Sequence, residues 1–321
     1  MLGAATINKQ ERVIGLELLS AASGLLIAIQ SRINGELSHR LGDSLEAAMV
    51  SFSTGLIFVS LIVISRKKTR SGFGLIFKAV SQKKLPKWRL IAGVLGSSFV
   101  AIQTHVVPIA GVALFTVASL AGQTAISLLV DKVGLSGGAK SAITKRRIIA
   151  ALITIFAVIV SAWDRFSMSN FSAIAILLAV ISGTWVGVQR ALNAQINIYS
   201  TQAFATSLLN FITGTTFLCS LVFVRYLISG QPLSKLIGAP WWVYLGGSIG
   251  VIYIAFSATA VQHMGVLVFT LFSVGGMLIG SLLIDLIAPT SGTDLSPYLF
   301  AGILLTYLGV IANGQSRFSR K

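Results

Sequence analysis

Ten long apolar stretches constrain this chain more than any other feature of its sequence. Each is close to the roughly 20 residues that an α-helix needs to cross the hydrocarbon core of a bilayer. Pro108 with Gly111, and Gly265, mark tight turns between the third and fourth stretches and between the eighth and ninth. A β-barrel would instead show short segments of alternating polarity. The sequence therefore predicts an all-α membrane protein with ten transmembrane helices, at about residues 13–33, 45–64, 88–107, 109–130, 147–163, 171–190, 203–228, 241–261, 264–287 and 298–314.

The composition supports this prediction, because the chain has too few charges to cover a water-exposed surface. Of its 321 residues, 55% are hydrophobic and 11% are charged, and the mean hydropathy is +0.86. An ordinary globular domain has about 25% charged residues. The first stretch contains Glu17 and has no small-residue cleavage site, so we expect it to be retained rather than removed as a signal peptide.

The basic residues predict the orientation of the chain in the membrane. The formal net charge is +16, and nine of the 25 lysines and arginines lie in residues 66–89, between the second and third stretches. With the N-terminus inside, the cytoplasmic segments hold 20 basic residues and the outer segments five. Cytoplasmic loops carry the excess of Lys and Arg, so we expect both termini in the cytoplasm. We interpret the basic loop as a contact with anionic membrane lipids, with no nucleic acid partner.

The chain also repeats itself. Residues 18–66 align without a gap to residues 177–225 at an offset of 159, and 12 of these 49 pairs are identical. Residues 88–131 align to residues 242–285 at an offset of 154, and 15 of these 44 pairs are identical. Matched Trp, Asp, Gln, Asn and Arg residues are not explained by a shared richness in Leu and Gly. The sequence therefore predicts two five-helix units, residues 1–166 and 167–321.

The connection between the second and third stretches of each unit indicates that the units have opposite orientations. This connection is strongly basic in the first unit, whereas in the second, at residues 226–241, its only charge is Lys235. Five helices is an odd number, so the second unit must enter the membrane from the opposite side. Two inverted repeats can exchange conformations and open a protein alternately to either side of the membrane. This pattern favours a transporter, although inverted repeats also occur in channels.

Several short motifs resemble those of a known family. Residues 26–55 contain Gln-x-x-x-Asn-Gly from Gln30 to Gly35, then Leu-Gly at 41–42, then Ser-Phe-x-x-Gly at 51–55. This segment resembles the first unit of the YdcZ-type family within the drug/metabolite transporter (DMT) superfamily, and residues 111–131 resemble the fourth helix of the same family. Many members are single five-helix units, and this chain resembles a fused, two-unit version.

The resemblance carries expectations about fold and function. It implies a drug/metabolite transporter-like (EamA-like) fold and a multi-pass secondary transporter of the bacterial inner membrane, acting as an exporter of small molecules. It implies no particular substrate. The second unit departs from the motifs, because Ala194 stands at the position equivalent to Gly35 and Met277 at the position equivalent to Gln123.

The strongest candidates for a substrate pathway are two pairs of amide side chains. Gln30 and Asn34 are four residues apart, as are their repeat equivalents Gln189 and Asn193. This spacing places each pair on one helix face, and amide groups that faced lipid would be costly. One interpretation is that the pairs line the two ends of a pathway. The other is that they form hydrogen bonds that hold the helices together.

Four carboxylates have less certain roles. Glu17 lies about one turn inside the first stretch, where it could bind a cation or exchange a proton, or pair near the membrane surface with Arg12 or with the basic loop. Proton coupling is therefore possible. Glu46 opens the second stretch, where it could cap the helix or contact substrate. Asp131 and Asp285 end equivalent stretches, and their repetition indicates a structural role.

Three aromatic residues complete the candidate pathway. Phe52 and its repeat equivalent Phe211, together with Trp185, could line a cavity for an aromatic or amphipathic substrate, or could fill the core. The histidines at positions 39, 105 and 263 are dispersed, and the chain has one cysteine, Cys219, so we expect no metal site. The sequence contains no P-loop, and we expect no cofactor, no enzymatic activity and no ATP-driven transport.

The function predicted from the sequence is secondary transport of a small organic molecule, with export favoured, by alternating access between two inverted repeats. The alternatives are a membrane scaffold or sensor subunit whose repeats serve structure alone, and a passive facilitator or lipid scramblase.

Overall fold

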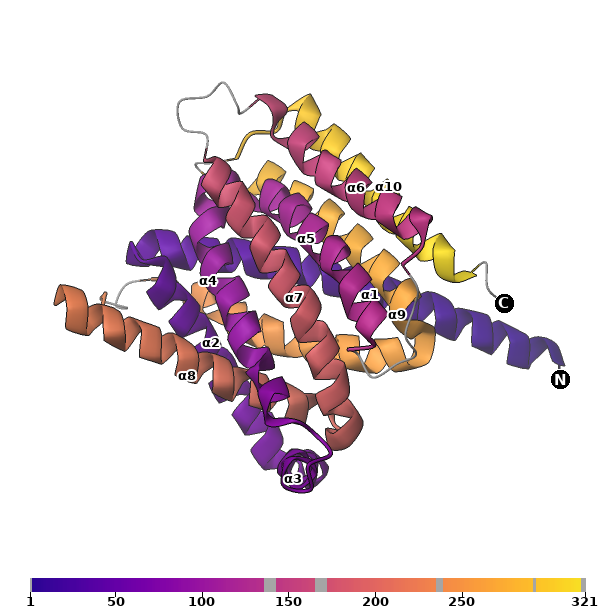
Figure 1. Cartoon of the computed structure of the whole chain (residues 1–321), viewed down its shortest axis with the longest axis horizontal. Helices are drawn as coiled ribbons and strands as arrows, with labels where there is room; N and C mark the ends of the chain where they lie inside the picture. Colours follow the sequence, from indigo (N-terminus) through magenta and orange to yellow (C-terminus); the bar gives the residue numbers. More distant parts are fainter. Residues whose placement is uncertain (1, 136–142, 165–171, 235–238, 291–292, 319–321) are drawn as a thin grey trace.

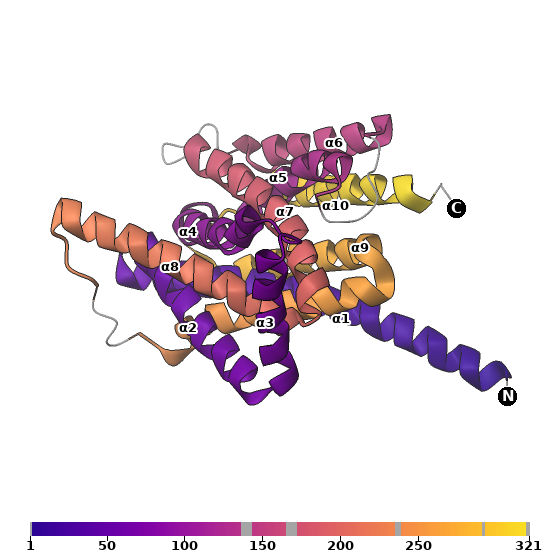
Figure 2. The same cartoon turned by 60° about the horizontal axis from the view of Figure 1, so that its bottom comes forward.

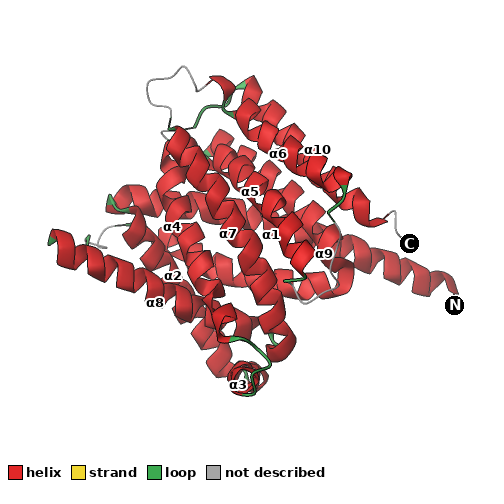
Figure 3. Ribbon diagram, viewed as in Figure 1, coloured by secondary structure: helices red, strands yellow, loops and turns green. Residues whose placement is uncertain are grey.

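The computed structural model describes residues 2–135, 143–164, 172–234, 239–290 and 293–318, and every regular element within these ranges is helical (Figure 3). The all-α prediction is therefore confirmed for the described residues. The predicted boundary between residues 166 and 167, and Lys235, lie outside them. The elements are α1 (Leu2–Leu41), α2 (Ser44–Ser65), α3 (Lys67–Ser81), η1 (Lys87–Ile91), α4 (Ala92–Ala110), α5 (Val112–Val133), α6 (Lys145–Ser161), α7 (Ala173–Ser200), α8 (Ala203–Ser229), η3 (Trp241–Leu245), α9 (Gly246–Ile287) and α10 (Pro297–Phe318).

The predicted stretches coincide with these helices, with ends shifted by a few residues. Of the described helical segments, six are long and apolar enough to cross a membrane, and three shorter apolar helices accompany them in the second half of the chain. Large apolar side chains point away from the protein, for example Leu61, which is 63% exposed, and Ile228, which is 82% exposed. An apolar surface of this kind is suited to lipid rather than to water. The six segments are residues 15–41, 44–65, 87–110, 112–130, 173–200 and 203–229.

The eighth and ninth predicted helices are one continuous helix, so the predicted break between residues 261 and 264 is wrong. Figures 1 and 2 show that α9 bends back on itself instead, forming two limbs. In the first half, Pro108 lies in the last turn of α4, and Gly111 ends that helix with a φ of 80°. The residue equivalent to Pro108 is Gln262, which keeps the backbone N–H that a proline lacks. The helical hydrogen bonding can therefore continue through the second turn.

The basic connection at residues 66–89 is partly helical rather than a plain loop. It contains α3, whose buried residues Ile76 and Ala79 pack with Leu192 of α7 and Leu209 of α8. Its charged side chains stay exposed. A helix with one apolar face and one basic face is suited to lie at a membrane surface.

Equivalent glycines of the two halves make equivalent contacts across the interface between the halves. Gly24 of α1 lies against the carbonyl oxygen of Ser273 in α9, and its repeat equivalent Gly183 of α7 lies against the carbonyl oxygen of Ser119 in α5. Small residues of this kind let membrane helices approach closely. The repeat relates a second pair of contacts in the same way: Gly122 contacts Val180, and Gly276 contacts Ala21. The pairs α1–α9 and α5–α7 are therefore packed in the same way, with the halves interchanged.

The equivalent helices α2 and α8 run antiparallel. Asp43, just before α2, forms an ion pair with Arg225 near the end of α8. Phe52, farther along α2, contacts Phe211 near the start of α8. Moving forward along α2 therefore means moving backward along α8. Equivalent helices that point in opposite directions are what an inverted repeat requires, so the predicted inversion agrees with the fold.

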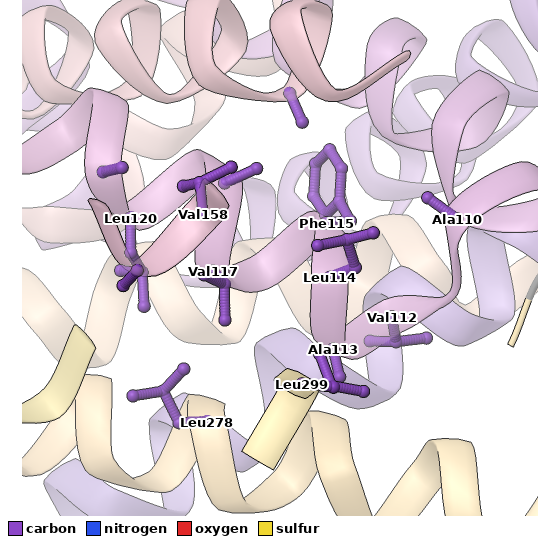
Figure 4. Close-up of a cluster of buried hydrophobic side chains, with 14 of the residues drawn as sticks. Ala110, Val112, Ala113, Leu114, Phe115, Val117, Leu120, Val158, Leu278 and Leu299 are labelled. Carbon is purple, nitrogen blue, oxygen red and sulfur yellow. The ribbon is translucent and has the colours of Figure 1, made fainter. Parts of the chain in front are cut away.

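The largest apolar core surrounds α5. Figure 4 shows Leu114, Phe115, Val117 and Leu120 of this helix packed among residues of α6, α9 and α10. In Figures 1 and 2, α6 and α10 lie side by side at one edge of the molecule. Helix α5 is thus surrounded by other helices, whereas α6 and α10 form a peripheral pair.

The structural role predicted for Asp285 is visible at the start of α5. Its two carboxylate oxygens accept hydrogen bonds from the backbone N–H groups of Val112, at 3.0 Å, and Ala113, at 2.7 Å. Asp285 is 1% exposed, so the end of α9 caps a helix of the other half from within the protein. The side chain of Asp131 lies outside the described residues.

We expect Asp285→Ala to destabilise the protein by about 1–2 kcal/mol, because two N–H groups at the start of α5 lose their acceptor. The measurement is the unfolding of purified protein in detergent, followed by tryptophan fluorescence. Thr144→Ala is the matched control, because Thr144 caps α6 through a single hydrogen bond of 3.4 Å and should cost less. Equal losses for the two variants would contradict the special role of Asp285.

Candidate functional site

Phe52 and Phe211 form a buried aromatic pair at the centre of the interface between α2 and α8. Their ring centroids are 5.0 Å apart, and the side chains are 7% and 3% exposed. Each ring also packs on a glycine of the other helix, Phe211 on Gly55 and Phe52 on Gly214. The pair thus fills the place where the two halves meet.

The first amide pair belongs to a buried hydrogen-bonded chain that links α1 to α4. Asn34 Nδ2 donates to Gln103 Oε1 at 3.0 Å, and Gln103 Nε2 donates to Ser31 Oγ at 2.8 Å. Ser31 in turn donates to the carbonyl oxygen of Ile27 at 2.9 Å. Gln30 is 8% exposed and forms no hydrogen bond with any described residue. We call Gln30, Asn34, Ser51 and Gln103 the first amide group.

The second amide pair is held by a different helix. Asn210 of α8 donates from Nδ2 to Asn193 Oδ1 at 2.7 Å, and its Oδ1 accepts a hydrogen bond from Gln189 Nε2 at 3.2 Å. Asn210 also donates to the carbonyl oxygen of Thr206 at 2.9 Å. We call Gln189, Asn193 and Asn210 the second amide group.

The two amide groups lie on opposite sides of the aromatic pair. Ser51 precedes Phe52 in α2, and Asn210 precedes Phe211 in α8. Since these helices run antiparallel, the two preceding residues lie toward opposite ends of the bundle. Gly250 of α9 separates Gln30 from the aromatic pair: a Cβ placed there would lie 2.8 Å from Gln30 Nε2 and 3.6 Å from the Phe211 ring.

An ion cluster joins the halves at one end of α2 and α8. Arg225 contacts the carboxylates of both Asp43 and Glu46. Asp43 caps α2 by accepting from the backbone N–H of Glu46 at 2.8 Å, and Ser234 N–H donates to Glu46 Oε2 at 2.8 Å. Asp43 therefore supplies the capping hydrogen bond expected at this helix start, and Glu46, in the first turn of α2, is in addition a buried partner of Arg225. We call Arg225, Asp43 and Glu46 the Arg225 cluster.

At the opposite end of the same helix pair, no described carboxylate takes part in the closure. Arg66, the repeat equivalent of Arg225, lies over the ring of Phe204, with its guanidinium carbon 5.8 Å from the ring centroid. Gly72 of α3 packs there against Ser200 and Gln202 at the junction of α7 and α8. The two ends of the helix pair therefore differ in chemistry although the repeat relates them.

The remaining candidates lie apart from the amide groups. Glu17 is half-buried on α1 and has no polar partner among the described residues, and the side chain of Arg12 lies outside them. Trp185 is half-buried on α7 and forms no hydrogen bond or ring contact with any described residue. The structure therefore brings together the four amides and the two phenylalanines, and it leaves Glu17 and Trp185 outside this arrangement.

The four side chains of the first amide group are buried, whereas Gln189 and Asn193 of the second are half-buried and only Asn210 is fully enclosed. A shallow, largely apolar groove with a volume of about 430 Å³ lies on the outside of α2 and α8. It is lined by Leu56, Ile212, Thr215, Thr216, Cys219, Ser220 and Phe223, none of which belongs to an amide group.

Sequence reasoning missed Gln103, Ser51 and Asn210, which complete the amide groups. Ser51 and Asn210 occupy equivalent positions but are different residues, so a search for identical residues at equivalent positions could not find them. A signal was available in the sequence, since each of the three is a polar residue within an otherwise apolar stretch.

Most of the chain is similar to known proteins. A protein-family model described as "Putative inner membrane exporter, YdcZ" matches it twice, over residues 16–160 and 174–312. Eight chains of solved structures match. One of them, described only as "Crystal structure of protein", aligns over 95% of this chain and 98% of its own length, with a TM-score of 0.59 and 12% sequence identity. At that identity, the likeness shows a shared fold alone. No curated protein matches the chain.

Proposed function

The chain belongs to the YdcZ family of the drug/metabolite transporter superfamily, a family of inner membrane exporters, and from this we propose that it moves a small organic molecule by alternating access. It is a multi-pass protein of the inner membrane, and its two repeats are the two ranges that the family matches. Transport is powered in this proposal by a proton gradient or by exchange, with both termini in the cytoplasm.

The observation that carries the proposal is the arrangement of polar and aromatic residues at the interface between the halves. The Phe52–Phe211 pair blocks the centre, and one amide group lies on each side of it, the first buried and the second half-buried. Amide groups supply both donors and acceptors, so each group can replace the hydration of a polar solute. A solute that binds one group would reach the other only after the aromatic pair separates.

The two closed ends support this proposal. The Arg225 cluster closes one end of α2 and α8, and α3 with Arg66 closes the other. Alternating access requires that one end opens while the other stays closed. With the basic connection in the cytoplasm, the Arg225 cluster is the outer closure and α3 is the inner one.

Purified protein in liposomes tests the proposal. A screen for ligands that raise the melting temperature, run against metabolites and cationic drugs, identifies a solute, and its radiolabelled form is then followed across the liposome membrane. Saturable flux with accelerated exchange is the expected result. Flux without saturation would indicate a passive facilitator, and a bound ligand without flux would indicate a sensor or scaffold.

We expect Gln30→Ala or Asn193→Ala to reduce transport by about tenfold, which corresponds to the loss of one hydrogen bond to the solute. The melting temperature should change little, because an interhelical hydrogen bond in a membrane contributes about 0.6 kcal/mol. Gln82→Ala is the matched control, since Gln82 is exposed at the end of α3. Loss of folded protein with unchanged activity per folded molecule would show that the amides only hold the helices together.

A further inference from the structure

The two amide groups are equivalent by the repeat, yet they differ at one position. In the second group, the carboxamide of Asn210 bridges the pair: it accepts from Gln189 at 3.2 Å and donates to Asn193 at 2.7 Å. In the first group, the equivalent position holds Ser51. A serine side chain has two fewer heavy atoms than an asparagine side chain and has no carboxamide, so it cannot make this bridge.

The direction of the Asn34 amide is fixed by its neighbours. The Ser31 hydroxyl donates to Ile27 O and therefore accepts from Gln103 Nε2, which leaves Gln103 Oε1 to accept from Asn34 Nδ2. Asn34 Oδ1 consequently points the other way as an acceptor. It lies toward Gly246 of α9, where a Cβ would overlap with it and would lie 3.2 Å from Ser51 Oγ.

Neither Asn34 Oδ1 nor Ser51 Oγ has a hydrogen-bond partner among the described residues, although the two side chains are 0% and 2% exposed. Leaving a buried polar atom unpaired costs about 1–3 kcal/mol. Such atoms are rare in native proteins, and each calls for an explanation. The second group suggests the explanation, because there the carboxamide of Asn210 pairs with the residues equivalent to Gln30 and Asn34.

We propose that the first amide group is a binding site for a ligand with a carboxamide edge, meaning a carbonyl oxygen beside an N–H donor. The ligand carbonyl accepts from Gln30 Nε2, its N–H donates to Asn34 Oδ1, and Ser51 Oγ adds a third polar contact. In the second group, the Asn210 side chain makes the two hydrogen bonds that we assign to such a ligand. Primary amides, ureas and peptide-like amides carry this edge. The inference rests on the proposed function in that it assigns a ligand chemistry to the proposed pathway.

Charged ligands fit this site less well than a neutral carboxamide does. A carboxylate offers no donor to Asn34 Oδ1, and an alkylammonium ion offers no acceptor to Gln30 Nε2. Entry to the site requires the first limb of α9 to move, because Gly246 and Gly250 lie directly over Asn34 and Gln30. Alanine is equivalent to Gly246 in the other half, at position 92, so the close approach of Asn34 Oδ1 to α9 depends on a glycine that the second half lacks.

The test compares acetamide, acetate and ethylamine as probes of the purified protein in detergent. Saturation-transfer difference NMR follows the methyl signal of each probe, and titration gives its dissociation constant. We expect saturable binding of acetamide, and binding at least tenfold weaker for acetate and ethylamine. Affinity of acetate or of ethylamine equal to that of acetamide, or no saturable binding of acetamide, would overturn the carboxamide assignment.

The deciding variant is Ser51→Asn, which gives the first group the residue of the second. We expect it to lose acetamide binding by at least tenfold while its melting temperature equals or exceeds that of the wild type. Ser65→Asn makes the same substitution at the exposed end of α2 and should bind acetamide like the wild type. If Ser51→Asn does not fold, Gln30→Leu, which removes the donor, must show the same loss of binding. Undiminished binding in a folded variant would refute the site.

Binding and transport can fail separately. A protein that binds acetamide through Ser51 but moves no solute in liposomes keeps this inference and refutes the proposed function. A protein that transports some other solute saturably, with no acetamide binding, refutes the inference and keeps the function.

Discussion

Arg225→Gln is expected to destabilise the protein by about 3–5 kcal/mol, the usual cost of removing one partner of a buried ion pair. The reason is the burial of Glu46, whose side chain is 4% exposed and which would keep its charge without the guanidinium. The Ser234 N–H would remain as a partner of Glu46, but a single neutral donor does not compensate a buried carboxylate. The change is measured as the unfolding transition of the purified protein in detergent.

Arg66→Gln is the matched control for this substitution. The repeat places Arg66 at the equivalent position, where it contacts the Phe204 ring and no carboxylate among the described residues, so the loss should stay near 0.5–1 kcal/mol. Adding Glu46→Gln to Arg225→Gln removes the uncompensated charge and should restore part of the stability. If Arg66→Gln and Arg225→Gln cost the same, the Arg225 cluster has no special role.

Gly276→Ala is the second substitution with a large expected effect, a loss of about 3 kcal/mol or more. A Cβ at this position would overlap with the backbone carbonyl of Ala21 in α1, and backbone atoms cannot move aside as a flexible side chain can. In an open part of a helix the same change is favourable by about 1 kcal/mol, because alanine is the better helix former. The sign of the effect therefore reports the close contact between α1 and α9.

Gly74→Ala and Gly15→Ala are the controls, since no atom lies within 4 Å of a Cβ at either position. Both should leave the melting temperature unchanged or raise it. Gly122→Ala, the repeat equivalent of Gly276→Ala, should cost as much, because the Cβ would meet the carbonyl of Val180. A stable Gly276→Ala protein would show that α1 and α9 are farther apart than described.

Sequence reasoning could predict the architecture because the repeat preserved the residues on which the packing depends. Gly24 and Gly183 stood out as identical pairs, and each touches a serine carbonyl of the other half. The continuity of α9 could not be predicted, because both halves have a glycine where a turn is expected, Gly111 in the first and Gly265 in the second. What differs is the proline of the first half, whose effect depends on the packing around each turn.

The candidate site was predictable only in part. Asn34 and Asn193 are repeated, so the alignment identified them, and Phe52 and Phe211 were found in the same way. The Arg225 cluster was not predictable, because it joins residues 179 and 182 positions apart, and the other half has no counterpart of its carboxylates. An alignment of the two halves identifies only residues that both halves share, so it cannot reveal contacts that occur in one half alone.

The glycine contacts have a consequence for how the protein can change shape. Helix α1, from the first half of the chain, is interlocked with α9 from the second, and α7 is interlocked with α5 in the same way. Two helices in backbone contact cannot slide past one another without losing that contact. If the protein works by the proposed alternating access, the bodies that rotate are therefore mixed, each assembled from helices of both halves. A cut in the chain near its middle, which severs the covalent link between the halves, should leave these bodies intact and able to move.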